Sequence, residues 1–170
     1  MGKPLSAEEA LNEFPFPMVI VTTGRDGETA GMTATWATQV SWRPSYLGVA
    51  IYHKWRTLEL ILKHREFAVH LVSEKLLEAA LKVFGGMSSR KVDKFSLVRE
   101  KYGLRVARGS KVNVPVLLDA PIVFECLLKE HHVIGDHYLV VCDPVSVYRN
   151  NEDEPIVFHR GRSRTLGPPV

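Results

Sequence analysis

The sequence predicts a mainly β fold, a closed antiparallel barrel with a few helices at its margins. Runs of β-branched and aromatic residues recur at short intervals and are separated by turn residues. Helical patterns are few and do not alternate with the strands as they do in β-α-β folds. The chain has 170 residues, 45% of them hydrophobic, and no internal repeat. This length suffices for one core, so we expect a single domain over residues 1–170.

The expected elements follow from local signals along the chain. Ser6 and Glu9 have the spacing of a capping box, which predicts the first helix. Ser73 is placed to cap a later helix that ends at Gly85-Gly86 and carries Leu77, Ala80, Leu81 and Phe84 on one face. In order, we expect a helix over 7–12, a strand over 18–23, a turn at 25–27, a strand in the segment from 31, a strand over 46–52, a helix over 57–64, a strand over 67–72, the helix after 73, a loop-rich basic stretch to about 116, strands over 122–129 and 138–148 joined by a turn at 134–137, and a short strand over 156–159.

The segment from Gly31 to Pro44 is unusual for a core strand. It combines small residues and hydroxyls with two tryptophans, Trp36 and Trp42, and its alanine and glycine positions let a flat ligand lie close to the backbone. We assign Trp42 to packing or to an interface, as most tryptophans are. The candidate ligand-facing residues in this segment are Met32, Thr33, Ala34, Thr35, Trp36 and Ser41.

Two further segments offer groups suited to a phosphate. About ten residues after the first segment, His53, Lys54, Arg56 and Thr57 place cations and a hydroxyl at the start of a predicted helix. Ser88, Ser89 and Arg90 follow the Gly-Gly pair and resemble an anion-binding loop. Taken with the first segment, these residues predict a phosphorylated aromatic cofactor.

His137 is the candidate catalytic residue, because the Gly135-Asp136 turn sets it where loop and strand meet. The adjacent pair His131-His132 does not predict a metal site, since neighbouring strand residues point to opposite faces. Cys126 and Cys142 lie in different predicted strands without a Cys-x-x-Cys pair, and we expect two buried thiols rather than a disulfide. We expect no metal.

Several function classes lack their signature here. Phosphate-loop, dinucleotide-binding and serine-hydrolase glycine motifs are missing from the sequence. No apolar run is long enough to span a bilayer or to act as a signal core, so we expect a cytoplasmic protein with no membrane partner. The net charge is +3, and residues 84–111 carry eight Lys or Arg against two acidic residues. That stretch suits nucleic acid or a phosphorylated small molecule, and solvated loops are the alternative.

The order and spacing of several motifs identify a family that the chain resembles, the flavin reductase-like, FMN-binding split-barrel proteins. These include archaeal ferric reductase, flavoredoxin and the reductase components of two-component monooxygenases. The resemblance covers nearly the whole chain. Its motifs are the 17–23 run, Gly31-Met32-Thr33-Ala34-Thr35-Trp36 with Val40-Ser41 and Pro44, Thr57 before a helix, the 120–126 run, Gly135-Asp136-His137, and Phe158-His159-Arg160-Gly161-Arg162.

The resemblance implies a homodimer of Greek-key split barrels with FMN in a groove near the interface. It implies hydride transfer from NAD(P)H to flavin, with the flavin ring along residues 33–36 and the phosphate near Lys54, Arg56 and Thr57. His137 would place the nicotinamide, and Arg160 would lie in the same groove. A monooxygenase or other redox protein is the implied partner.

One departure and several alternatives remain. Ser163 stands where family members commonly carry an aromatic residue, so a stacking role for the tail does not transfer. A non-enzymatic FMN electron carrier of flavoredoxin type is the alternative to a reductase, and a nucleic-acid-binding barrel is a third reading that we do not favour. The choice between NADH and NADPH, the electron acceptor, and whether FMN is a fixed group or a substrate stay open.

Overall fold

The computed structural model describes residues 2–25 and 27–170, and in this part of the chain the main structural unit is an antiparallel sheet with the strand order β3-β2-β6-β9-β10-β5-β4. All its neighbouring strands are antiparallel. The predicted antiparallel, mainly β fold is confirmed. The strands of this sheet are β2 (Val19–Arg25), β3 (Glu28–Ala34), β4 (Ala37–Ser41), β5 (Tyr46–Tyr52), β6 (Glu66–Leu71), β9 (Ile122–Ile134) and β10 (His137–Arg149).

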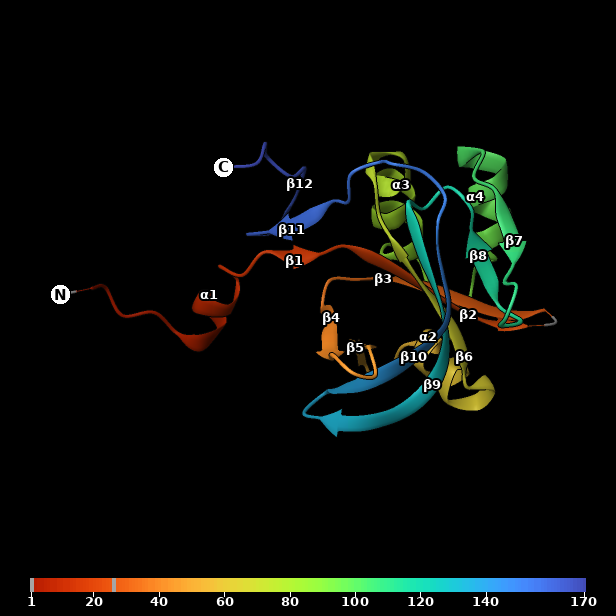
Figure 1. The fold of residues 1–170 in the computed structure, drawn as a ribbon, viewed down its shortest axis with the longest axis horizontal. Helices are drawn as coiled ribbons and strands as arrows, with labels where there is room; N and C mark the ends of the chain where they lie inside the picture. The colour runs from red at the N-terminus through yellow and green to blue at the C-terminus, as the bar shows by residue number, and fades with distance from the viewer. Residues whose placement is uncertain (1, 26) are drawn as a thin grey trace.

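Two smaller sheets flank the main one. β7 (Val106–Arg108) pairs with β8 (Pro115–Leu117). β11 (Val157–His159) pairs with both β1 (Phe16–Pro17) and β12 (Arg162–Arg164). The predicted short strand near 156–159 is therefore present, and β12 is an addition in the tail. Figure 1 shows this second small sheet and the N-terminal helix extending to one side of the main sheet, together with both chain ends.

The helices are α1 (Ala7–Leu11), α2 (Arg56–His64), α3 (Glu74–Ala79) and α4 (Lys94–Tyr102), and the π-helix η1 (Ala80–Phe84) continues α3. The capping box of Ser6 and Glu9 is formed at α1. The predicted apolar face of the helix after Ser73 is correct at Ala80 and Phe84, which are buried, and at Leu77, which packs against the core. It is wrong at Leu81, which is exposed, and it omits Leu76 and Val83, which are buried. The π-helical turn changes the register of side chains around the axis, which a regular helical period does not anticipate.

Residues 85–116 are not simply loop-rich, as the sequence reading expected. They contain α4, which Asp93 caps through the backbone amides of Phe95 and Ser96, and which ends at Gly103 with positive φ. The residues from 31 to 44 also form two strands rather than one. β3 lies at one edge of the main sheet and β4 at the other, so the chain crosses from edge to edge at Thr35-Trp36.

The apolar core has two parts. One lies inside the curved main sheet, where Val21, Val49, Ile51 and Phe67 pack with Leu58 and Ile61 of α2. The other lies between the sheet and the α3, η1 and α4 helices, which Figure 1 shows on one side of it. This arrangement leaves β3 between α2 and the segment after η1. The two segments predicted to bind a phosphate, at 53–57 and 88–90, therefore both lie beside β3.

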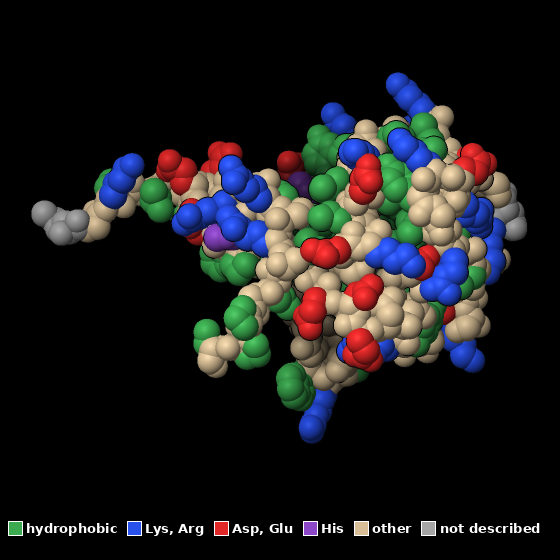
Figure 2. All heavy atoms as spheres, turned by 90° about the horizontal axis from the view of Figure 1, so that it is seen from above, with side chains coloured by type: hydrophobic (Ala, Val, Ile, Leu, Met, Phe, Trp, Pro, Cys, Tyr) green, Lys and Arg blue, Asp and Glu red, His purple; other side chains and the backbone are tan. Residues whose placement is uncertain are grey.

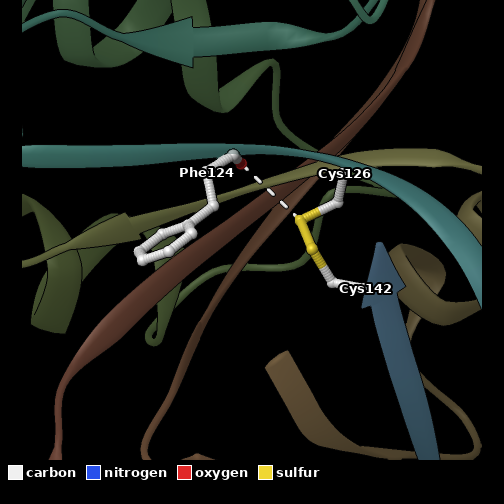
Figure 3. The surroundings of a disulfide bond; sticks show 3 residues. All are labelled: Phe124, Cys126 and Cys142. Atoms are coloured by element: carbon white, nitrogen blue, oxygen red, sulfur yellow. Dashed lines mark hydrogen bonds between the residues drawn. A yellow bond between two sulfur atoms is a disulfide. The ribbon is translucent and has the colours of Figure 1, made fainter. Parts of the chain in front are cut away.

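Cys126 and Cys142 form a disulfide that links β9 to β10, so the expectation of two free thiols is wrong (Figure 3). Both residues are fully buried, and their Cα atoms are 5.2 Å apart. The β9–β10 ladder shifts register on both sides of this position, between Val141 and Cys142 and again between Pro144 and Ser146. The irregular register, rather than the sequence spacing, brings the two sulfurs together.

Trp42 is 74% exposed, so it does not pack into the core of its own chain, and of the two predicted roles only the interface role is left.

The basic residues of 84–111 do not form one continuous patch. Lys94 is buried, and Arg105 is bound to Asp119. Figure 2 shows Lys and Arg side chains interspersed with acidic ones on the face that it presents. Across the described residues, every helix is too short or too polar to cross a membrane.

Candidate functional site

A hollow of about 200 Å³ lies at the start of α2, between β3 and the segment that follows η1. We call it the phosphate hollow. It brings together three parts of the chain that the sequence pattern singled out separately. Its lining is Gly31, Met32, Thr33, Lys54, Trp55, Arg56, Thr57, Phe84, Gly85, Met87, Ser88, Ser89, Arg90 and Lys94.

The start of α2 is suited to an anion. Its N-cap residue is Trp55, whose side chain makes no capping hydrogen bond. The first backbone amides of a helix have no partner within the helix, so here they remain available to a bound group. Lys54, Arg56 and Arg90 add positive charge around the same point. These groups fit a phosphate monoester, which combines negative charge with several acceptor oxygens.

Arg56 is held by two carboxylates before any ligand binds. It pairs with Glu59 on its own helix, and its Nη2 lies 2.9 Å from Oε1 of Glu28. Glu59 also pairs with Arg90 at 2.9 Å, which ties the segment after η1 to α2. Glu28 accepts a further bond from Lys63 at 2.7 Å, and these cations lower the pKa of Glu28 to about 2. The arginines are therefore oriented by a network that spans three elements.

Lys94 forms part of the wall and was not among the predicted site residues. Its Nζ donates to the carbonyls of Gly31 at 2.7 Å and of Phe84 at 2.9 Å, and burial lowers the pKa of Lys94 to about 8. The hydroxyl of Ser89 is within hydrogen-bond distance of both the amide and the carbonyl of Gly31. These side chains hydrogen-bond the backbone of Gly31 on the outer edge of β3, which lies at the end of the strand order in the described part of the chain.

A second hollow, of about 210 Å³, continues the first toward the Gly135-Asp136 turn, and we call it the ring hollow. It shares Met32, Thr33 and Trp55 with the phosphate hollow. The rest of its lining is Ala34, Thr35, Trp36, Ala50, Tyr52 and His137. Its small residues and aromatic rings fit a planar ligand whose phosphate lies in the phosphate hollow.

His137 stands at the far end of the ring hollow. Its Nδ1 lies 2.6 Å from Oδ1 of Asp136, which leaves Nε2 free of that contact. This hydrogen bond is the main reason that the pKa of Asp136 is lowered. The imidazole packs against Trp36 with ring centroids 4.8 Å apart and against Tyr52 at 5.6 Å. The ring is thus fixed in orientation by one carboxylate and two aromatic neighbours.

The structure brings most predicted site residues to these two hollows, but three lie elsewhere. The lining of neither hollow includes His53, Ser41 or Arg160. The Nδ1 of His53 faces the carbonyl of Asp136 at 2.9 Å, so it supports the turn from behind. Ser41 is the last residue of β4, and Arg160 is paired with Glu13 at the turn between β11 and β12.

Trp55, Tyr52 and Lys94 line the hollows and were missed by the sequence reading. Trp55 lies inside the predicted cationic cluster, so the cluster itself was the available signal. Nothing in the sequence indicated that Lys94 is buried, because a lysine in a basic stretch is normally exposed. Among residues 2–25 and 27–170, no group of three or more His, Cys, Asp or Glu side chains is placed to hold a metal ion.

The fold and the two hollows define a class: an antiparallel split-barrel protein with two adjoining hollows whose linings suit a phosphate and a planar ring. Residues 11–167 match the family of the flavin reductase like domain, and the chain belongs to that family. An uncharacterized protein of Aeropyrum pernix is 30% identical over 94% of this chain. An FMN reductase (NADH), RutF 1, of Methylorubrum extorquens is 25% identical over 93% of it. The chain spans 64% of the first relative's length and 74% of the second's.

Solved structures share this fold at low sequence identity. The NADH:FAD oxidoreductase SgcE6 of Streptomyces globisporus superimposes with a TM-score of 0.85, at 22% identity and with 99% of each chain covered. Flavoredoxin of Methanosarcina acetivorans superimposes with a TM-score of 0.84, at 20% identity, covering all of this chain and 94% of its own. The likeness includes both a reductase and a protein named as a flavoredoxin, and it confirms the split-barrel fold.

Proposed function

We propose that this chain is an NAD(P)H-dependent flavin reductase formed by a single domain over residues 1–170. The observation that carries the proposal is the joined pair of hollows. One holds the uncapped start of α2 with its cations, and the other holds small residues, aromatic rings and His137. A flavin mononucleotide has a planar ring at one end and a phosphate at the other, which matches this order.

The protein's own residues bind and orient in this proposal. The amides at the start of α2, with Lys54, Arg56 and Thr57, hold the phosphate, while the loop of Ser88, Ser89 and Arg90 closes over it. Met32 to Trp36 support the ring. His137 positions the nicotinamide through its Nε2, since Nδ1 is engaged by Asp136. A bound flavin supplies the hydride-accepting chemistry, so the site needs no acid-base pair of its own.

The proposal is tested by measuring FMN and riboflavin binding to the purified, flavin-free protein by fluorescence quenching, followed by anaerobic mixing with NADH or NADPH. We expect micromolar or tighter FMN binding and bleaching of the flavin absorbance by at least one nicotinamide. Lys54→Gln should weaken FMN about fivefold to tenfold and leave riboflavin, which lacks the phosphate, unchanged. Lys129→Gln removes a charge from β9, outside both hollows, and should change neither. Absence of FMN binding at micromolar concentration refutes the proposal.

An electron carrier of flavoredoxin type is the second candidate, because the same hollows would hold its FMN. It differs in one measurable step. A carrier binds FMN tightly but is reduced by NAD(P)H only negligibly, whereas it accepts electrons from a partner protein. The variant His137→Gln further distinguishes a reductase from an electron carrier. In a reductase the change raises the KM for the nicotinamide and leaves FMN binding unchanged.

We also propose a homodimer with the flavin near its interface, and a monooxygenase component or other redox protein as the partner. Large apolar side chains that a monomer leaves exposed support the dimer, among them Trp42 at 74% and Val133 at 66%. Light scattering after size exclusion tests the oligomeric state, with Trp42→Ser and Val133→Ser expected to shift it toward the monomer.

We propose a cytoplasmic location, with no nucleic-acid or membrane partner. A disulfide is unusual in that compartment, but Cys126 and Cys142 are fully buried, so cellular reductants cannot reach the sulfurs without unfolding. Thiol alkylation of freshly lysed cells, with and without denaturant, tests whether the bond is present there.

A further inference from the structure

Glu59 lies in the first turn of α2, beside the phosphate hollow but outside its lining. Its two carboxylate oxygens are shared between the two arginines of that lining. Oε1 pairs with Arg56, and Oε2 lies 2.9 Å from Nη2 of Arg90. In the described part of the chain, the side chain of Glu59 pairs with these two arginines alone. The phosphate hollow therefore has a negative charge of its own beside the cations that a ligand would use.

Both terminal nitrogens of Arg56 already face a carboxylate. Nη1 donates to Glu59, and Nη2 lies 2.9 Å from Oε1 of Glu28. If Arg56 turns toward a ligand, Glu28 keeps Lys63 as a partner at 2.7 Å. Glu59 keeps only Arg90 among the described residues, and Arg90 lines the same hollow. A phosphate that draws both arginines toward itself therefore competes with Glu59 directly.

The charge of Glu59 also acts on the start of α2 itself. The first amides of a helix carry a partial positive charge that suits an anion, and a carboxylate in the first turn offsets part of that charge. The Glu59 side chain is 49% exposed, so water and salt weaken its interactions without removing them. One exposed ion pair changes an equilibrium constant by roughly 1.5-fold to fivefold. Glu59 forms two such pairs, so its effect on a bound phosphate is large enough to measure.

We propose that Glu59 is a specificity-determining residue that competes with the ligand's phosphate for Arg56 and Arg90, and so limits the affinity for a phosphorylated flavin. The inference rests on the proposed flavin site. A carboxylate that only oriented the two arginines would raise this affinity, so the two roles predict changes of opposite sign. Differences in affinity at one site arise mostly in the dissociation rate. Glu59 therefore speeds the release of FMN and favours its exchange with the solution over its retention.

The test compares Glu59→Gln with the unmodified protein, both full-length and flavin-free, by measuring the dissociation constants of FMN and riboflavin through fluorescence quenching. Glutamine keeps the length of the side chain and one acceptor oxygen but removes the charge. We expect FMN to bind about fivefold more tightly at low salt and to dissociate more slowly in stopped-flow exchange. Riboflavin, which lacks the phosphate, should bind as before. The gain for FMN should decrease as the ionic strength rises, because salt screens the exposed charges.

Glu78→Gln is the matched control. Glu78 is 58% exposed, pairs with Lys82 and lies outside both hollows, so this variant removes the same charge without touching the arginines. It should change the dissociation constant of FMN by no more than about twofold. When Arg90→Gln is already present, Glu59→Gln should give a smaller gain, because one of the two pairs of Glu59 is then missing. Thermal unfolding of each variant checks that the fold is intact.

Three results would overturn the inference. Weaker FMN binding by Glu59→Gln would assign Glu59 to orienting the arginines, and unchanged binding would leave it no role toward the phosphate. An equal gain for riboflavin would show that the change does not act through the phosphate. The same gain from Glu78→Gln would assign the effect to the net charge of the protein. Absence of FMN binding to the unmodified protein is a different outcome, because it refutes the proposed function itself.

Discussion

Removing the disulfide between Cys126 and Cys142 is expected to lower the stability of the fold by about 3 kcal/mol. The two cysteines are 16 residues apart in the sequence. A cross-link that closes a loop of this size reduces the entropy of the unfolded chain by about 10 cal/mol/K, which corresponds to about 3 kcal/mol at 25 °C. For a chain of this length, the loss should lower the Tm by roughly 6 to 12 °C.

The assay is equilibrium urea unfolding of the flavin-free protein, followed by tryptophan fluorescence and circular dichroism. Cys126→Ala, Cys142→Ala and the double variant Cys126→Ala/Cys142→Ala are compared with the unmodified chain. If the stabilisation comes from the cross-link, the single change already loses it. The second change then adds less than about 1 kcal/mol, so the two losses are strongly non-additive. The unmodified protein, unfolded and refolded in reductant, should match the double variant.

Two results would contradict this reasoning. A loss below about 1 kcal/mol in the single variant would show that the cross-link does not stabilise the native state. Equal and additive losses from Cys126→Ala and Cys142→Ala would assign the effect to the packing of each buried side chain instead. An unchanged denaturant slope is also required, because a change in slope would indicate that the compactness of the unfolded state had changed.

The remaining predictions concern buried polar groups and one close contact. Burial lowers the pKa of His70 to about 4 in the folded protein. As the pH falls, His70 is therefore protonated in the unfolded chain before it is protonated in the folded one. Stability should therefore fall by about 3 kcal/mol as the pH drops from 6.5 to 4, and His70→Gln should lose this dependence in acid-urea titrations. Glu125 accepts backbone bonds from Ser110, Lys111 and Val112, and Glu125→Gln should cost about 2 to 4 kcal/mol in urea unfolding, because an amide group cannot accept them all. Gly31→Ala should cost about 1 to 3 kcal/mol, since a Cβ would lie 2.8 Å from the Phe84 ring, and Phe84→Leu should recover part of it in a double-mutant cycle.

The strands were predictable from the sequence because their signal is local. β5 begins and ends where the β-branched and aromatic run does, and β9 and β10 surround the predicted glycine turn. The helix α4 was missed although Asp93 and Gly103 mark its two ends, because four of its nine residues are charged and the apolar period is weak. Tertiary burial of Phe95 and Val98 makes the helix, and that contact is not visible in the residues around it.

The disulfide could not be predicted from spacing, and the reason is the register of the β9–β10 hairpin. Counting outward from the turn at 135–136 in regular register places position 145 opposite Cys126, three residues from Cys142. An odd offset puts the two side chains on opposite faces of the sheet. The register shift between Val141 and Cys142 moves β10 by one residue, and both sulfurs then lie on the same face.

The site shows the same limit at Gly31. The small residues of β3 were taken to leave room for a flat ligand, but at Gly31 that room is filled by the ring of Phe84. The glycine therefore serves the packing of η1 against β3, and this packing also places the Phe84 carbonyl within reach of Lys94. Lys94 then joins the end of η1 to the free edge of β3 through Gly31. The walls of the phosphate hollow are thus fixed by buried contacts between residues that are distant in the sequence. The sequence pattern therefore predicted the cations Lys54, Arg56 and Arg90 of its lining, but not the buried contacts of Gly31, Phe84 and Lys94.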